Sequence, residues 1–130
     1  MRSIFFLFLF AIIALFQACA IAQTNSRSDP DQKVLDQLHI AGSDLSKAHK
    51  IQFFLYFPSE EKATEASADI QAEGLHVEVQ KGTTGTEWLC LAKKEMIPEH
   101  SELVRLRNVL ESIAKKLNGE YDGWGTDVVK

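Results

Sequence analysis

The residues that most often carry out chemistry in proteins are few in this 130-residue chain, and they are widely spaced. Zinc sites need cysteine and histidine ligands at short, fixed spacings. The four histidines are instead separated by 10, 27 and 24 residues: His39, His49, His76 and His100. The chain also has no G-x-S-x-G serine motif and no glycine pattern for binding a nucleotide. The sequence therefore predicts no metal site and no cofactor.

Cys90 is a second candidate for chemistry, as a nucleophile. It lies in an apolar run, residues 88–92 (WLCLA), with no cysteine at the spacing of a redox pair. A reactive thiolate needs an electropositive and partly open setting. We therefore expect Cys90 to be a buried structural thiol and the protein not to be an enzyme. An unrecognised enzyme is a distant alternative.

Two aromatic residues, Phe54 and Tyr56, share one face of a predicted strand over residues 50–57 (KIQFFLYF). Aromatic side chains on an open four-stranded sheet can stack on RNA bases. However, the chain has a net charge of −4, and the part after residue 22 carries −5. Binding to a phosphate backbone requires clustered lysine and arginine. We therefore expect an amino-terminal helix or a protein partner, and not nucleic acid, to cover these side chains.

The first 22 residues have the organisation of a signal peptide, and 19 of them are apolar. Residues 4–16 form an unbroken apolar run, and an A-x-A motif follows at residues 20–22. This pattern predicts cleavage before Gln23 and export to the periplasm or the medium. The alternatives are an uncleaved membrane anchor and a lipoprotein acylated at Cys19.

After the signal peptide, residues 23–31 form a polar, flexible leader, and residues 32–130 form one domain of ordinary size. A helix is predicted to begin at Asp29 or Pro30, where the aspartate can cap it and the proline fits the first turn, and to end at Gly42. The remaining periodicities predict, in order, a strand over residues 50–57, a helix capped by Ser59, strands over residues 75–80 and 87–93, a helix from Pro98 to residues 118–119, and an extended segment over residues 120–128.

This order of elements indicates an α+β fold. After the first helix, the β-α-β-β-α-β succession is typical of the ferredoxin-like arrangement, in which two helices cover one face of a four-stranded antiparallel sheet. We therefore expect a ferredoxin-like sandwich with an extra amino-terminal helix.

The last predicted strand carries Trp124 between glycines, in residues 121–125 (YDGWG). Glycine in a strand can permit close approach of a neighbouring backbone. We expect Trp124 to pack against the edge of the sheet. The alternative is that it is a partly exposed binding anchor beside Asp122, because tryptophan is enriched among interface hot spots.

Several short runs in the domain match the pattern of a known family. They are residues 36–38 (DQL), 42–47 (GSDLSK), 53–58 (FFLYFP), 74–79 (GLHVEV), 88–92 (WLCLA), 96–98 (MIP) and 118–125 (NGEYDGWG), of which the last is the most specific. On these residues the chain resembles the bacterial family of the regulator of ribonuclease E activity B (RraB), over about residues 33–128.

The resemblance implies a ferredoxin-like core and a regulatory role without catalysis. The member that gives the family its name binds ribonuclease E and inhibits RNA processing as a protein partner. By family motif, the resemblance also implies a binding role for five residues: Phe54, Tyr56, Tyr121, Asp122 and Trp124. Ribonuclease E works in the cytoplasm, whereas the leader directs export. We therefore expect a protein-binding domain with an unidentified partner, with inhibition of ribonuclease E as the alternative.

Overall fold

The structure is a computed structural model that describes residues 29–83 and 85–130. The predicted signal peptide, including Cys19, and residues 23–28 of the leader lie outside the described residues. Residues 31–130 form one compact unit. No helix within the described ranges is long and apolar enough to cross a membrane.

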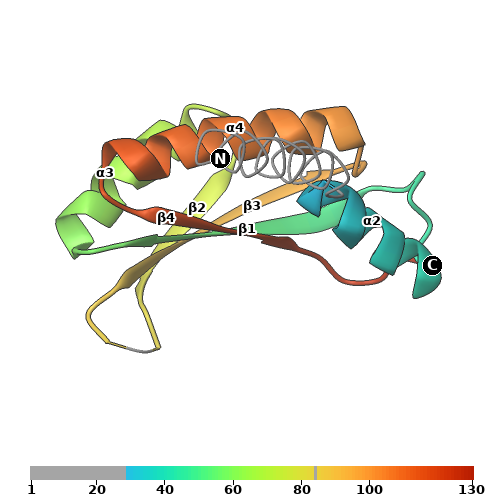
Figure 1. Cartoon of the computed structure of the whole chain (residues 1–130), viewed down its shortest axis with the longest axis horizontal. Helices are drawn as coiled ribbons and strands as arrows, with labels where there is room; N and C mark the ends of the chain where they lie inside the picture. Colours follow the sequence, from blue (N-terminus) through green and yellow to red (C-terminus); the bar gives the residue numbers. More distant parts are fainter. Residues whose placement is uncertain (1–28, 84) are drawn as a thin grey trace, which may run out of the picture. The chain divides into compact units, whose positions relative to one another are not determined.

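The described residues form three helices and four strands: α2 (Pro30–Ile40), β1 (His49–Phe57), α3 (Glu60–Gln71), β2 (His76–Lys81), β3 (Trp88–Met96), α4 (His100–Lys116) and β4 (Glu120–Gly125). The sheet order is β2-β3-β1-β4, and every neighbouring pair is antiparallel. Figure 1 shows α3 and α4 side by side on one face of the sheet. This arrangement confirms the predicted ferredoxin-like fold.

α2 begins at Pro30, as predicted. The ends of β3 and β4 differ from the predicted ones. β3 continues to Met96 because it stays paired with β1 as far as His49. β4 ends at Gly125, which is its last residue that pairs with β1.

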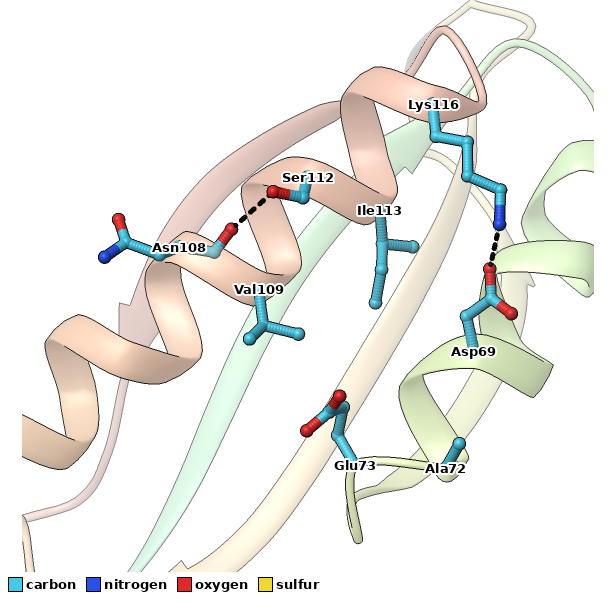
Figure 2. A pocket seen from close by; sticks show the side chains of 8 residues that line it. All are labelled: Asp69, Ala72, Glu73, Asn108, Val109, Ser112, Ile113 and Lys116. Carbon is cyan, nitrogen blue, oxygen red and sulfur yellow. Dashed lines mark hydrogen bonds and ion pairs between the residues drawn. The ribbon is translucent and has the colours of Figure 1, made fainter.

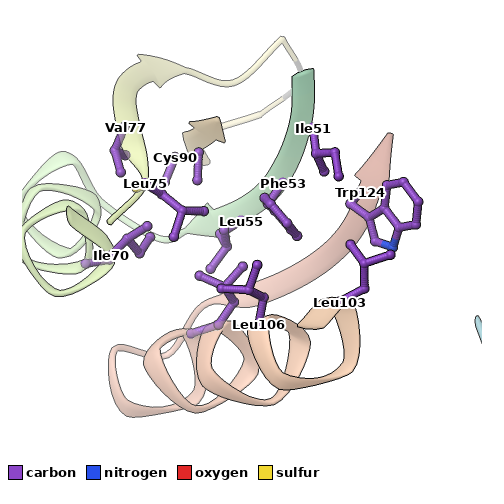
Figure 3. Close-up of a cluster of buried hydrophobic side chains, with 14 of the residues drawn as sticks. Ile51, Phe53, Leu55, Ile70, Leu75, Val77, Cys90, Leu103, Leu106 and Trp124 are labelled. Carbon is purple, nitrogen blue, oxygen red and sulfur yellow. The ribbon is translucent and has the colours of Figure 1, made fainter. Parts of the chain in front are cut away.

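The core lies between the sheet and the two helices that cover it. Four alternating residues of β1 are fully buried on this face: Ile51, Phe53, Leu55 and Phe57. The leucines of α4 and the apolar residues of β2 and β3 surround them (Figure 3). Each buried side chain of this size contributes roughly 1.5–3 kcal/mol to stability. The central strand β1 thus contributes four fully buried side chains to the core.

α3 approaches the sheet closely because its inner face is small. Ala63 and Ala66 are completely buried there. Ser59 caps the helix as predicted, and its Oγ accepts a hydrogen bond from the backbone N–H of Lys62 at 3.2 Å. At this close distance the Sγ of Cys90 on β3 reaches the carbonyl oxygen of Ala63 at 3.1 Å.

Two residues end helix α4, one through its backbone conformation and the other through close packing. Asn118 takes the left-handed conformation, with φ of 58°. The N–H of Gly119 then bonds to the carbonyl of Ala114 at 2.7 Å, which completes a Schellman cap. A Cβ on Gly119 would lie 2.5 Å from both the carbonyl oxygen of Tyr56 and the ring of Phe57. Glycine is therefore required at position 119 by close packing against β1.

We predict that Gly119→Ala destabilises the domain by about 1–3 kcal/mol, because the new methyl group must displace the backbone of β1. Gly125→Ala is the matched control: a Cβ there meets nothing within 4 Å, and the residue has no positive φ. Its effect should stay within about 0.5 kcal/mol. Urea unfolding of both variants measures the difference, and equal stabilities would contradict the packing argument.

Candidate functional site

The face of the sheet opposite α3 and α4 carries an apolar patch at its centre. Phe54 on β1 pairs with Leu91 on β3, and Tyr56 pairs with Leu89. All four side chains are half-buried. None of the described helices lies over this face in Figure 1. We call these four residues the open-face patch.

The amino-terminal helix α2 does not cover the open-face patch, although the sequence allowed for this. Its buried residues Leu35 and Leu38 join the core on the helix-covered side of the sheet. Its first turn is held on the same side by Asp31, which bonds to Trp124. Among the described residues, the amino-terminal helix is therefore not the cover of this face.

Acidic side chains border the patch on both sides. On β4, Glu120 pairs with Tyr56 and Asp122 is exposed at a bulge. On β2, Glu78 forms an ion pair with Lys93, with 3.4 Å between Oε2 and Nζ. The patch is therefore an apolar surface with carboxylates at its margins.

The bulge in β4 turns both of its aromatic side chains toward the helices. Trp124 pairs with Phe53 on β1. The next paired core-side residue, Tyr121, lies opposite Leu55, so two residues of β4 oppose one of β1. In a regular strand, residues three apart would point to opposite faces. The extra residue is accommodated by Gly123, whose φ is +93°.

The glycines beside Trp124 serve a different purpose from the predicted one. A Cβ on Gly123 or Gly125 would meet nothing within 4 Å. Close approach of a neighbouring backbone is therefore not their reason. Gly123 is needed because its positive φ is costly for any residue with a Cβ.

Trp124 is one member of a buried polar cluster that joins α2, α4 and β4. It is 8% exposed, and its Nε1–H donates to Oδ1 of Asp31 at 3.1 Å. Arg107 on α4 lies with its Nε 3.3 Å from Oδ2 of the same carboxylate. Asp31 is only 2% exposed, and a buried carboxylate needs such partners to offset its loss of hydration. Trp124 thus packs at the sheet edge.

Tyr121 lies in the same region. Its hydroxyl is enclosed and has no hydrogen-bond partner among the described residues. Burial raises the pKa of this hydroxyl above its ordinary value, and the negative charges of Asp31 and Glu111 raise it further. The phenol therefore stays neutral at physiological pH.

The five residues expected to bind a partner do not lie on one surface. Phe54 and Tyr56 belong to the open face, and Asp122 is exposed beside them. Tyr121 and Trp124 face the helices and are withdrawn from that surface. Within the family motif, Tyr121 and Trp124 thus stabilise the fold, whereas Asp122 borders the open face.

Sequence reasoning missed one buried polar pair. The Nε2 of His49 lies 2.6 Å from the hydroxyl of Ser43, and its Nδ1 donates to the carbonyl of Lys47 at 2.8 Å. The hydroxyl also accepts the backbone N–H of Val129 at 3.0 Å. Spacing along the chain gives no signal for this contact, because Val129 is 86 residues from Ser43.

The pair resembles a nucleophile and its base, but its surroundings give it a structural role. His49 is fully buried and Ser43 is 6% exposed. The hydroxyl is occupied by the histidine and by the carboxyl-terminal segment. A nucleophilic serine needs space beside it for the reacting carbon. Ser43, held by His49, therefore binds the backbone of Val129 in the carboxyl-terminal segment.

The thiol and the histidines show no arrangement for metal binding or nucleophilic chemistry. Burial raises the pKa of the Cys90 thiol to about 11, so it is protonated at neutral pH. Within the described part of the chain, no three side chains of histidine, cysteine, aspartate or glutamate are grouped to hold a metal ion.

A groove lies between α3 and α4, with a volume of about 560 Å³. Val109 and Ile113 of α4 form its apolar side, and Lys116 reaches across to Asp69 of α3 at 3.0 Å (Figure 2). This ion pair spans the groove and is exposed. Unlike the open-face patch, the groove has no aromatic residue among those that line it.

We predict that Trp124→Ala lowers the stability of the domain by about 3–5 kcal/mol, because a large buried side chain is lost. Trp124→Phe keeps the ring packing but removes the donor to Asp31, and should cost about 1–3 kcal/mol. Thermal denaturation of both variants measures these changes. An unchanged melting temperature with loss of partner binding would instead make Trp124 a binding anchor.

Comparison with known families agrees with this architecture. The family model described as regulator of ribonuclease activity B matches residues 28–126. A search of curated proteins gave no significant match. The matched region includes every helix and strand described above. The chain therefore belongs to the regulator of ribonuclease activity B (RraB) family.

Proposed function

We propose that this protein is an exported regulatory domain that binds another protein through the open-face patch and catalyses no reaction. The observation that carries the proposal is a sheet face with a central apolar patch that none of the described helices covers, in a chain that belongs to a family of regulators. Aromatic side chains are enriched at protein interfaces because they bury a large area at low entropic cost. Phe54 and Tyr56 are suited to this role.

The charges around the patch favour a protein over a nucleic acid. The chain carries a net charge of −4, and Glu120 and Asp122 stand at the margin of the patch. Phosphates approaching Phe54 and Tyr56 would be repelled by these carboxylates. A nucleic-acid surface needs the opposite charge in the same place.

The proposal of export rests on the amino-terminal sequence. The apolar run over residues 4–16 and the A-x-A motif at residues 20–22 are the features that a signal peptidase requires. A partner would then be met outside the cytoplasm. The second candidate function is inhibition of ribonuclease E in the cytoplasm, which the family description favours.

We predict that the protein recovered from cells begins at Gln23, as measured by amino-terminal sequencing. Ala22→Asp should leave the precursor uncleaved, because the position before the cut accepts only small, neutral side chains. Cys19→Ala is the control and should not change processing. Retention of Met1 in the wild-type protein, or fatty acid on Cys19, would contradict cleavage at Ala22.

We predict that a photo-crosslinking amino acid in place of Tyr56 gives a covalent adduct with a protein partner in cells. The same amino acid in place of Ser112, which lines the groove between α3 and α4, is the matched control and should give none. The reverse result would place the interface in the groove. Absence of an adduct at both positions would argue against a protein-binding role.

The two candidate functions differ in what the purified protein does to ribonuclease E. Under the first, a molar excess leaves the rate of RNA cleavage unchanged, and the protein is found in the periplasmic fraction. Under the second, cleavage slows and the protein is cytoplasmic. Slower cleavage together with cytoplasmic location would replace the first proposal with the second.

A further inference from the structure

One end of the open face differs sharply in charge from the other. Near Tyr56, where β1 ends and β4 begins, three exposed carboxylates lie close to the aromatic side chains: Glu87, Glu120 and Asp122. Among the described residues no ion pair involves any of them. The aromatic end of the face therefore carries negative charge that the domain does not itself neutralise.

This end of the face is hollowed. A pocket of about 520 Å³ is lined by Tyr56, Phe57, Pro58, Thr86, Glu87, Asn118, Gly119 and Glu120. Its charged lining residues are both carboxylates, on opposite sides of β1 in the order of the sheet. We call it the end pocket.

The other end of the face differs in charge from the end pocket. A hollow of about 430 Å³ is lined there by Lys50, Ile51, Gln52, His76, Lys93, Lys94 and Glu95. Lys93 forms an ion pair with Glu78, and Lys94 forms one with Glu102, whereas the carboxylates of the end pocket have no such partner among the described residues. A partner that docks along β1 and β3 therefore meets an apolar patch with unneutralised negative charge at the end pocket.

The chemistry of the end pocket suits one kind of side chain. An arginine guanidinium stacks on aromatic rings and donates two parallel hydrogen bonds to a carboxylate. Tyr56 supplies a ring, and Glu87 and Glu120 supply carboxylates. Lysine would satisfy the charge but not the planar stacking. A phosphate or an acidic side chain would be repelled.

We propose that the end pocket receives an arginine side chain of the protein partner, while apolar side chains of the same segment lie on the open-face patch. This inference rests on the proposed function, because it names the chemistry of the partner that the patch binds. It places the arginine of the partner segment at the end of β1.

The test uses the purified processed protein and a fluorescent peptide of alternating leucine and arginine. Two matched peptides replace arginine by citrulline, which keeps the shape without the charge, or by glutamate. Anisotropy titration at low salt should show about fivefold tighter binding of the arginine peptide than of the citrulline peptide. Raising the salt concentration should reduce the difference, because exposed charges are screened.

Protein variants locate the effect. Glu87→Gln combined with Glu120→Gln should remove the preference for arginine. Glu61→Gln combined with Glu65→Gln, on the exposed side of α3, changes the net charge equally and should retain it. Equal binding of the arginine and citrulline peptides, or preferred binding of the glutamate peptide, would overturn the inference. Binding of a fluorescent uridine oligonucleotide to the protein, measured without the peptide, would also overturn it.

The adduct formed at position 56 separates this inference from the proposed function. If an adduct forms and its mapped partner segment contains no arginine, the inference is wrong and the protein-binding role stands. If that segment contains an arginine, the inference is supported. If no adduct forms at position 56 or at position 112, both are wrong.

Discussion

The hydrogen bond from the indole of Trp124 to the buried carboxylate of Asp31 is the interaction on which the exposed surface of this domain depends. This carboxylate is 2% exposed, and Trp124 and Arg107 help to offset its lost hydration. Together they tie the first turn of α2 to β4 and α4. With α2 held on the helix-covered side, the opposite face of the sheet keeps no cover from the described helices (Figure 1).

The bulge in β4 makes this arrangement possible. Tyr121 and Trp124 are three residues apart, and a regular strand would send one of them to the open face. Because Gly123 adopts a positive φ, both rings turn to the core side, and Asp122 is left exposed. Because of the bulge, the residues of one sequence motif have two different roles. Its aromatic rings support the fold, and its carboxylate contributes to the charge of the open face.

The carboxyl-terminal segment is held by a second buried polar group of a similar kind. Ser43 lies in the loop after α2, His49 is the first residue of β1, and the backbone of Val129 bonds to Ser43. The first cluster joins α2, α4 and β4, and the second joins the loop after α2 and the start of β1 to the carboxyl-terminal segment. In both, a few directed hydrogen bonds fix a chain segment that hydrophobic burial alone would leave unspecified. The central core is apolar instead: the inner faces of β1 and α4 bury Ile51, Phe53, Leu55 and Phe57 and Leu103, Leu106 and Leu110.

The sequence by itself determined the order and type of the elements, because the alternation in residues 50–57 and the leucine spacing of α4 are local patterns set by strand and helix geometry. It also placed Cys90 in the core and the cap at Ser59. Only the tertiary structure decided on which face of the sheet each expected binding residue lies. Phe54 and Trp124 were expected to share a binding role, yet they lie on opposite sides of the sheet, since one bulged residue reverses the direction of a side chain. The contacts of Asp31 with Trp124 and of Ser43 with Val129 join residues 93 and 86 positions apart. No local pattern encodes such contacts, because they form only when distant segments are brought together by the packed sheet.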